Sequence, residues 1–169
     1  MARPAAPRLA DPYRDTAVID ARAPRTNQTV VALMAIAALV SGAWWLASLM
    51  GLQLLVGLTL GRRFCLPCLA YFELIQPRLG EGPLEDSRPP RFANVIGASV
   101  LGAATLAFLA GVAPVGWALV GLVAALASLS AITGFCTGCW LYRTINGDCE
   151  ICDLPDVPRA VLDAERARA

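Results

Sequence analysis

The six cysteines of this 169-residue chain all stand in C-x-x-C motifs, and the chain contains no histidine. The pairs are Cys65 with Cys68, Cys136 with Cys139, and Cys149 with Cys152. Two thiols at this spacing can exchange disulfides or persulfides with a partner. Four thiolates together can hold zinc or an iron–sulfur cluster. Thiol exchange and metal binding are therefore the two chemistries that the cysteines indicate.

Thiol exchange requires a thiolate, and the first pair stands where one would be stabilised. In "RRFCLPCLAYFELI" the proline suits the first turn of a new helix, with Cys65 or Leu66 as its cap. The N-terminus of that helix and the adjacent Arg62 and Arg63 would each favour a thiolate at Cys65. The segment that follows is expected to lie along the membrane interface.

Metal binding is the alternative interpretation of the same residues. Because histidine is absent, four thiolates are the simplest ligand set, and the last two pairs form C-x-x-C-x9-C-x-x-C. The ligands of this zinc or iron–sulfur site would be Cys136, Cys139, Cys149 and Cys152. Alternatively, the first two pairs could form one site together and leave the third pair mobile.

Two long segments without charged side chains predict an integral membrane protein. Hydrophobic residues make up 57% of the chain and charged residues 16%, and the uncharged segments cover residues 29–60 and 92–142. One membrane crossing takes about 20 helical residues. The second segment holds two spans with a turn near Gly111, Pro114 and Gly116. The first holds two if the chain turns at 41–45 and its second helix extends to Phe64, so we predict an all-α protein with four transmembrane helices.

An internal repeat accompanies these spans. The pattern D-x-R-x-P-R precedes each uncharged segment, starting at Asp20 and Asp86, and C-x-x-C-x-x-Y ends each one, at Tyr71 and Tyr142. This pattern predicts a duplicated two-helix unit. A unit that crosses twice returns to the side where it began, so the copies have parallel topology and both C-x-x-C motifs face one side.

The units define the expected organisation of the chain. We expect a polar N-terminal tail (1–28), repeat 1 with the first C-x-x-C and an interfacial helix (29–75), a loop (76–91), repeat 2 (92–142) and a C-terminal tail with the third pair (143–169). All 14 basic residues are arginines, and every one falls in the tails, the loop or adjoining helix ends. The positive-inside rule therefore predicts cytoplasmic N and C termini.

The repeated arginines allow two interpretations. They could anchor the helix entrances to lipid phosphates, with Asp20 or Asp86 pairing with a neighbouring arginine. They could instead form an anion or partner-binding pocket beside the cysteines. The four residues concerned are Arg22, Arg25, Arg88 and Arg91. The net charge of +1 gives no support to a nucleic-acid partner.

The stretches "DARAPRTNQ", "LEDSRPPRFANVIG" and "GFCTGCWLY" resemble the bacterial membrane family catalogued as domain of unknown function 4395. The resemblance covers roughly Val18 to Tyr142. Members are small multi-pass proteins, often encoded near or fused to thioredoxin-like proteins and near rhodanese-type sulfurtransferases. The resemblance implies thiol or sulfane-sulfur handling at Cys65, Cys68, Cys136 and Cys139; Cys149 and Cys152 lie outside it.

These features favour an inner-membrane protein that relays reducing equivalents or sulfane sulfur with a thioredoxin-like or sulfurtransferase partner. Cys65 and Cys136 would attack, Cys68 and Cys139 would resolve, and the third pair would act as a mobile shuttle. A non-enzymatic membrane scaffold with a four-thiolate metal site is an alternative, and a small sulfur-compound permease is another. Membrane lipid is an expected partner, and oligomers are compatible with the short, glycine-rich spans.

Overall fold

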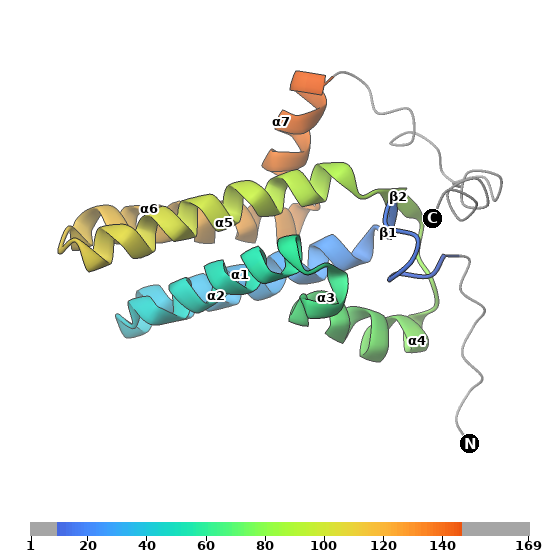
Figure 1. Ribbon diagram of the computed structural model, residues 1–169, viewed down its shortest axis with the longest axis horizontal. Helices are drawn as coiled ribbons and strands as arrows, with labels where there is room; N and C mark the ends of the chain where they lie inside the picture. The colour runs from blue at the N-terminus through green and yellow to red at the C-terminus, as the bar shows by residue number, and fades with distance from the viewer. Residues whose placement is uncertain (1–9, 147–169) are drawn as a thin grey trace.

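A computed structural model describes residues 10–146, and this part of the chain is mostly helical (Figure 1). Each of two short strands precedes a hairpin of two long helices. The first set is β1 (Val18–Asp20), α1 (Arg22–Ser41) and α2 (Trp44–Thr59), and the second is β2 (Leu84–Asp86), α5 (Arg88–Leu109) and α6 (Ala113–Thr133). Between them lie η1 (Arg62–Phe64), α3 (Leu66–Ala70), the π-helix η2 (Tyr71–Ile75) and α4 (Gln76–Leu79), and α7 (Thr137–Asn146) follows α6.

The strands were not anticipated from the sequence, and they explain why the long helices begin early. β1 and β2 pair antiparallel, with Val18 opposite Asp86 and Asp20 opposite Leu84. Asp20 Oδ1 then accepts a hydrogen bond from the Arg22 N–H at 2.9 Å, and Asp86 Oδ1 accepts one from the Arg88 N–H at 2.8 Å. The aspartates thus satisfy backbone donors at the two helix starts, which lie before the uncharged segments that begin at residues 29 and 92.

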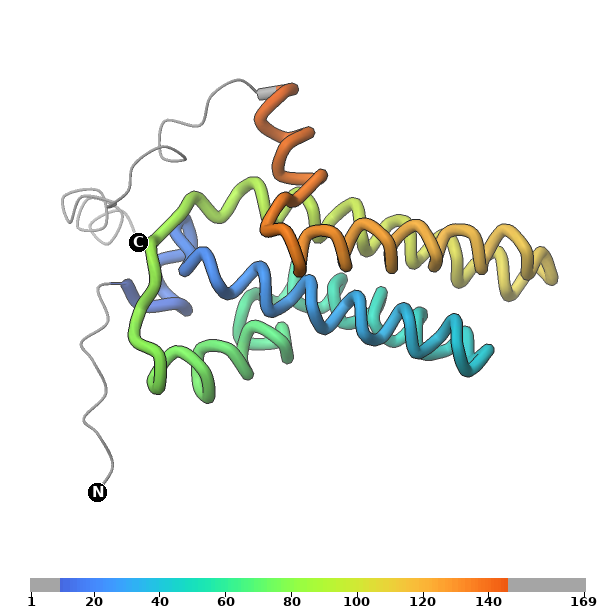
Figure 2. The backbone as a smooth tube through the Cα atoms, turned by 180° about the vertical axis from the view of Figure 1, so that it is seen from behind, coloured from blue at the N-terminus to red at the C-terminus, as the bar shows by residue number. Residues whose placement is uncertain are grey.

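The two hairpins pack across one another. α1 lies against α6 and α2 lies against α5, in addition to the contacts within each hairpin (Figures 1 and 2). Small side chains fill much of the shared core: Ala32, Ala35, Ala38, Ala47, Ala104, Ala124 and Ala127. At Gly51 a Cβ atom would stand 2.9 Å from the Leu101 Cβ. Small residues at such contacts let helix backbones approach closely, as is typical of helices packed in membranes.

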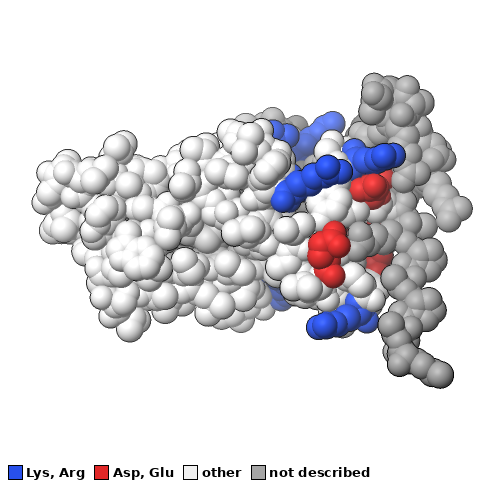
Figure 3. Space-filling view, turned by 60° about the horizontal axis from the view of Figure 1, so that its bottom comes forward, with Lys and Arg blue, Asp and Glu red and all other residues white. Residues whose placement is uncertain are grey.

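The large apolar side chains point outward. Leu33, Leu49, Leu52, Leu106, Leu109, Leu122 and Ile132 are among those exposed on the four long helices. Charged side chains gather at one end of the molecule, whereas the long helical part of the face shown in Figure 3 has none. α5 and α6 are each long and apolar enough to cross a membrane, and α2 is a shorter apolar helix. The chain therefore has helices that could span a membrane, while the full set of four spans stays a prediction.

The helix breaks follow local backbone chemistry. The first hairpin turns at Gly42, which has φ +69°, within the expected segment 41–45. The second turns at Gly111, with φ +77°, and Pro114 lies in the first turn of α6. Gly116, predicted to break the helix, lies inside α6, where a Cβ would stand 2.7 Å from the Phe108 ring. The predicted extension of the second helix to Phe64 is wrong, because Gly61 adopts φ +93° after α2 has ended.

Candidate functional site: two thiol cavities

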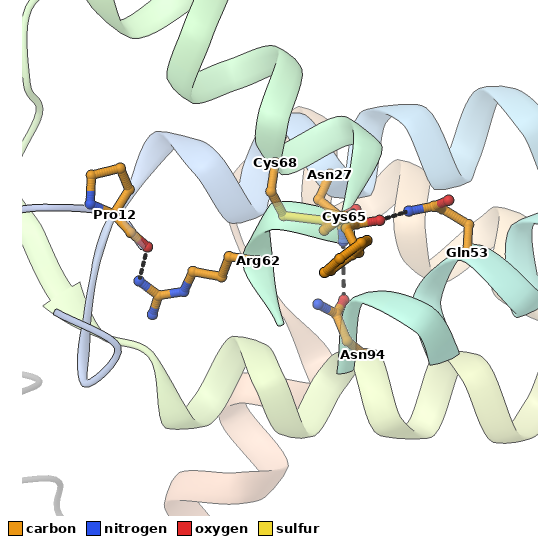
Figure 4. The surroundings of a disulfide bond; sticks show 8 residues. Pro12, Asn27, Gln53, Arg62, Cys65, Cys68 and Asn94 are labelled. Carbon is orange, nitrogen blue, oxygen red and sulfur yellow. Dashed lines mark hydrogen bonds between the residues drawn. A yellow bond between two sulfur atoms is a disulfide. The ribbon is translucent and has the colours of Figure 1, made fainter. Parts of the chain in front are cut away.

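The first cysteine pair is closed as a disulfide at the start of α3 (Figure 4). Cys65 occupies the N-cap position, its carbonyl accepts a hydrogen bond from the Leu69 N–H at 2.8 Å, and Pro67 lies in the first turn. The helix starts as the sequence predicted, whereas the thiolate expected at Cys65 is not seen, because the Cys65 sulfur is bonded to Cys68. Cys65 and Cys68 are only 6% and 8% exposed and pack in one cluster with Ile19, Ala23, Tyr71 and Phe72.

Amide side chains from three helices surround this disulfide (Figure 4). Asn27 Oδ1 lies 4.0 Å from the Cys65 Sγ, and Asn27 Nδ2 donates to Asn94 Oδ1 at 3.0 Å. Gln53 Nε2 donates to the Phe64 carbonyl at 2.7 Å, which fixes the residue before Cys65. The Asn27 to Asn94 hydrogen bond links α1 to α5 and therefore joins the two hairpins beside the disulfide.

The arginines that precede Cys65 hold the N-terminal segment. Arg62 donates hydrogen bonds to four backbone carbonyls at 2.6–3.3 Å: Pro12, Asp15, Thr16 and Val18. Burial, with a further contribution from the nearby Arg91 charge, lowers the pKa of Arg62 to about 10. Arg63 lies over the Tyr13 ring, with 5.4 Å from its Cζ to the ring centroid. The Arg62 guanidinium thus binds backbone carbonyl oxygens, a role that the sequence did not reveal.

The second pair, Cys136 and Cys139, is reduced and half-buried. The Cys136 carbonyl accepts a hydrogen bond from the Trp140 N–H at 2.9 Å, so Cys136 stands at the N-terminus of α7. The hydrogen bond from the Cys139 thiol lowers the pKa of Cys136 to about 6, against the opposing effect of burial and with help from the Gly138 and Cys139 N–H groups and Ser130. The same shared proton, together with burial, raises the pKa of Cys139. The pair is therefore arranged as a thiolate beside a thiol.

Each pair lines its own cavity. A cavity of about 290 Å³ contains Cys65 and Cys68, and a cavity of about 250 Å³ contains Cys136 and Cys139. Pro24, Pro90 and Asn94 line both of them. We call these the first and second thiol cavities. The fold places them next to one another at the end where the charged residues gather, separated by the starts of α1 and α5.

Each thiol cavity is lined by an arginine from the hairpin that does not precede its own cysteine pair. Arg91 of α5 lines the first thiol cavity, and Arg25 of α1 lines the second. Arg25 donates to the carbonyls of Ala131 and Ile132 at 3.1 and 3.0 Å, and Arg91 donates to the Leu58 carbonyl at 3.5 Å. Cations at helix C-termini are stabilised by the exposed carbonyl groups there. The two repeated arginines thus make equivalent contacts across the pair of hairpins.

The other two arginines of the expected anion pocket lie elsewhere. Within the described residues, Arg22 and Arg88 line neither thiol cavity. A Cβ at Gly82 would stand 3.1 Å from the Arg22 Nε, so Arg22 lies beside the loop that leads to β2. The structure therefore distributes the four arginines instead of gathering them around one site.

A four-thiolate metal site is not seen in the described part of the chain. Residues 10–146 contain no group of three or more histidine, cysteine, aspartate or glutamate side chains that could hold a metal ion. The first two cysteine pairs line different cavities, so they do not form the shared site considered above. The alternative set requires Cys149 and Cys152, which lie outside the described residues.

Two residues near the thiols were missed from the sequence. Gln28 and Asn94 occupy the same place in the two repeats, eight residues after Asp20 and Asp86, but the structure pairs Asn94 with Asn27. Ser130, which contributes a hydrogen bond to Cys136, is one of the few polar residues inside the second uncharged segment. A polar residue near the C-terminal end of a predicted span, just before a C-x-x-C, was the available signal.

The fold and these cavities define a helical protein with paired thiols at the charged end of an apolar bundle. Residues 19–146 match the family described as "Domain of unknown function (DUF4395)", and the chain belongs to that family. The match confirms the resemblance drawn from the sequence, includes the first two cysteine pairs and ends before the third. No curated protein and no solved structure matches the chain.

Proposed function

We propose that the chain is a four-span protein of the bacterial inner membrane, with its thiol cavities at the cytoplasmic side. The outward-facing leucines of α1 and α2 support counting these helices as spans together with α5 and α6, because a soluble bundle would bury such side chains. Restriction of arginine to one end of the long helices supports cytoplasmic N and C termini.

The proposal includes a duplicated unit. Both halves run in the order strand, aspartate cap, helix hairpin and C-x-x-C at the start of a further helix. Arg25 and Arg91, which the repeat aligns, also make corresponding contacts with the opposite hairpin. These correspondences support two copies related by a pseudo-two-fold axis along the bundle.

The proposed function is the relay of reducing equivalents or sulfane sulfur with a thioredoxin-like or sulfurtransferase partner. The observation that carries it is the position of Cys136 at the N-terminus of α7, next to Cys139 and in a cavity that both residues line, where the hydrogen bond from Cys139 lowers the pKa of Cys136. A thiolate so placed attacks a disulfide or persulfide, and a neighbouring thiol resolves the product.

In the disulfide reaction, the Cys136 thiolate attacks one sulfur of the partner's disulfide. A mixed disulfide forms, and the partner's other sulfur leaves as a thiolate and takes a proton. Cys139 then loses its proton and attacks the Cys136 sulfur, which closes the Cys136–Cys139 disulfide and releases the reduced partner. The partner gains two electrons and two protons, and the pair loses them.

The two pairs take different parts in this proposal. Cys136 and Cys139 are reduced and half-buried, so we assign the partner-facing step to them. Cys65 and Cys68 are buried and already joined as a disulfide, so their sulfurs are less accessible to a protein partner. We therefore place the first pair after the second pair in the relay, where its disulfide can accept a further two electrons.

Trapping the mixed disulfide tests the proposal. The full chain, purified in mild detergent and reduced, is mixed with an oxidised thioredoxin-like protein. Cys139→Ser should accumulate a covalent complex with that protein through Cys136, because the resolving thiol is missing. Cys136→Ser should form no such complex. Full exchange activity in the Cys65→Ser, Cys136→Ser double variant would reject the assignment of the attacking thiols.

A further inference from the structure

A third cavity, which we call the apolar cavity, shares Cys136 with the second thiol cavity. Its volume is about 130 Å³, and its walls come mainly from α5 and α6, including Ile96, Val100, Leu122, Val123 and Leu126. Among the described residues, no charged side chain lines it. Cys136 lines both this cavity and the second thiol cavity, whereas Cys139 lines the second thiol cavity alone.

The apolar cavity reaches the outer surface of the bundle. Leu122 and Leu126 stand on its wall and are 49% and 40% exposed, so they border its opening on the side of α6. That surface belongs to the apolar part of the molecule, which the proposed membrane topology turns toward lipid. A molecule dissolved in the lipid phase could therefore reach Cys136 without passing through water.

The apolar cavity shares its polar groups with the second thiol cavity. Gln28, Asn94 and Ser130 line both cavities, as Cys136 does. Asn94 Oδ1 accepts the hydrogen bond from Asn27, which leaves the Asn94 NH₂ group to donate. The cavity thus has apolar walls, amide donors where it meets the second thiol cavity and a nucleophilic sulfur that lines both. Apolar walls with a few polar groups are typical of small-molecule sites, and amide donors suit a ligand whose acceptors are ring carbonyl oxygens.

We propose that the apolar cavity binds the ring of a lipophilic quinone, which oxidises the Cys136–Cys139 dithiol. This inference rests on the thiol exchange proposed above and names the oxidant for the same pair. The amide groups of Gln28 and Asn94 are the donors for the quinone carbonyl oxygens, and the Ser130 hydroxyl stays hydrogen-bonded to Cys136.

The reaction balances as a two-electron transfer. The Cys136 thiolate passes an electron pair to the quinone ring, and the Cys139 sulfur bonds to the Cys136 sulfur as its S–H bond breaks. The pair loses two electrons and the Cys139 proton, water supplies the second proton because Cys136 is already ionised, and the quinone leaves as the hydroquinone. The exchange at the second thiol cavity then runs in the reverse of the direction written above: a thiolate of the partner attacks the Cys136–Cys139 disulfide, the partner leaves oxidised, and the pair is reduced again. Cys136 thus connects a lipid-soluble oxidant with a water-soluble dithiol.

The test uses the full chain with its thiols reduced, in lipid nanodiscs under anaerobic conditions. The probe is a decyl-substituted benzoquinone with every ring position occupied, which prevents addition of the thiol to an open ring carbon. We expect hydroquinone to form as a Cys136–Cys139 disulfide appears by mass spectrometry, and we expect Cys136→Ser to abolish the oxidation of this pair.

Leu126→Trp should fill the mouth of the cavity and slow the oxidation by about tenfold. Leu129→Trp is the matched control, because Leu129 lies on the same helix, is 43% exposed and does not line the cavity. Equal slowing by the two variants, or none by either, would overturn the assignment of the cavity.

A second measurement separates this inference from the proposed function. The same preparation is mixed with the oxidised thioredoxin-like protein in the absence of quinone. Exchange with that protein but no hydroquinone would overturn the quinone site and leave the relay standing. Failure of both reactions would overturn the relay as well.

Discussion

The thiolate at Cys136 gives the sharpest quantitative prediction. With a pKa of about 6, roughly 90% of Cys136 is ionised at pH 7, compared with roughly 1% at the ordinary value of 9.0. Thiolates of lower pKa are intrinsically weaker nucleophiles, and a Brønsted coefficient of about 0.4–0.5 reduces the rate per thiolate by about twentyfold over this range. Cys136 should therefore react with iodoacetamide about fourfold faster than an ordinary thiol at pH 7.

The titration midpoint is the more telling quantity. In a variant whose other four cysteines are serine, the alkylation rate at Cys136 should rise with pH, pass its midpoint near 6 and level off above it. The lowered pKa means that protonation removes the reactive form only in mild acid. Cys139→Ala deletes the largest stabilising hydrogen bond, so the midpoint should move up toward the ordinary value and the rate at pH 6 should fall severalfold.

Hydroxyl variants supply the control for this experiment. Ser130→Ala removes a weaker hydrogen bond to Cys136 and should raise the midpoint less than Cys139→Ala. Thr144→Ala should leave it unchanged, because the Thr144 hydroxyl donates to the Trp140 carbonyl of its own helix. A midpoint above pH 8 in the parent, or one that Cys139→Ala does not move, would refute the thiolate and thiol arrangement.

Four further predictions follow from the packing and the charge distribution. Arg62→Gln should speed the amide hydrogen exchange of residues 12–18 by about tenfold or more, because each lost hydrogen bond from a charged donor is worth about 1.5–3 kcal/mol. Arg78 is exposed, so Arg78→Gln should leave the exchange of these residues unchanged. Gly57→Ala should lower the Tm, because its Cβ would stand 3.0 Å from the Cys65 Cβ, and an equal or higher Tm would contradict the position of Cys65. Gly121 is at an open helical position, so Gly121→Ala should leave the Tm unchanged or raise it. In a cysteine-free chain, Ala43→Cys should react with an impermeant maleimide added outside spheroplasts, and Arg78→Cys only after lysis; the reverse would invert the topology. Anaerobically purified protein should carry substoichiometric zinc and iron, whereas stoichiometric metal lost when both cysteines of the third pair become serine would establish the four-thiolate alternative.

The sequence alone determined the features that depend on neighbouring residues. Gly42 and Gly111 mark the hairpin turns because both adopt positive φ, and Pro67 marks the start of α3. The C-x-x-C spacing indicated paired thiols, because residues three apart meet on one face at the start of a helix. The exclusion of arginine from the apolar segments indicated which end of the bundle would carry the charge. Each of these follows from local geometry or from the cost of burying a charge in an apolar environment.

Only the tertiary structure decided which groups surround the thiols. Arg62 stands three residues before Cys65, yet its guanidinium binds the carbonyls of residues 12–18, because those acceptors are brought there by the pairing of β1 with β2. Arg25 lines a cavity with Cys136, although more than one hundred residues separate them, because α1 packs against α6. A repeat in the sequence indicates that two units resemble one another, but it carries no information about which faces of their helices meet. Packing of small side chains between the hairpins determined which helix faces meet, and it placed the two cysteine pairs in separate cavities.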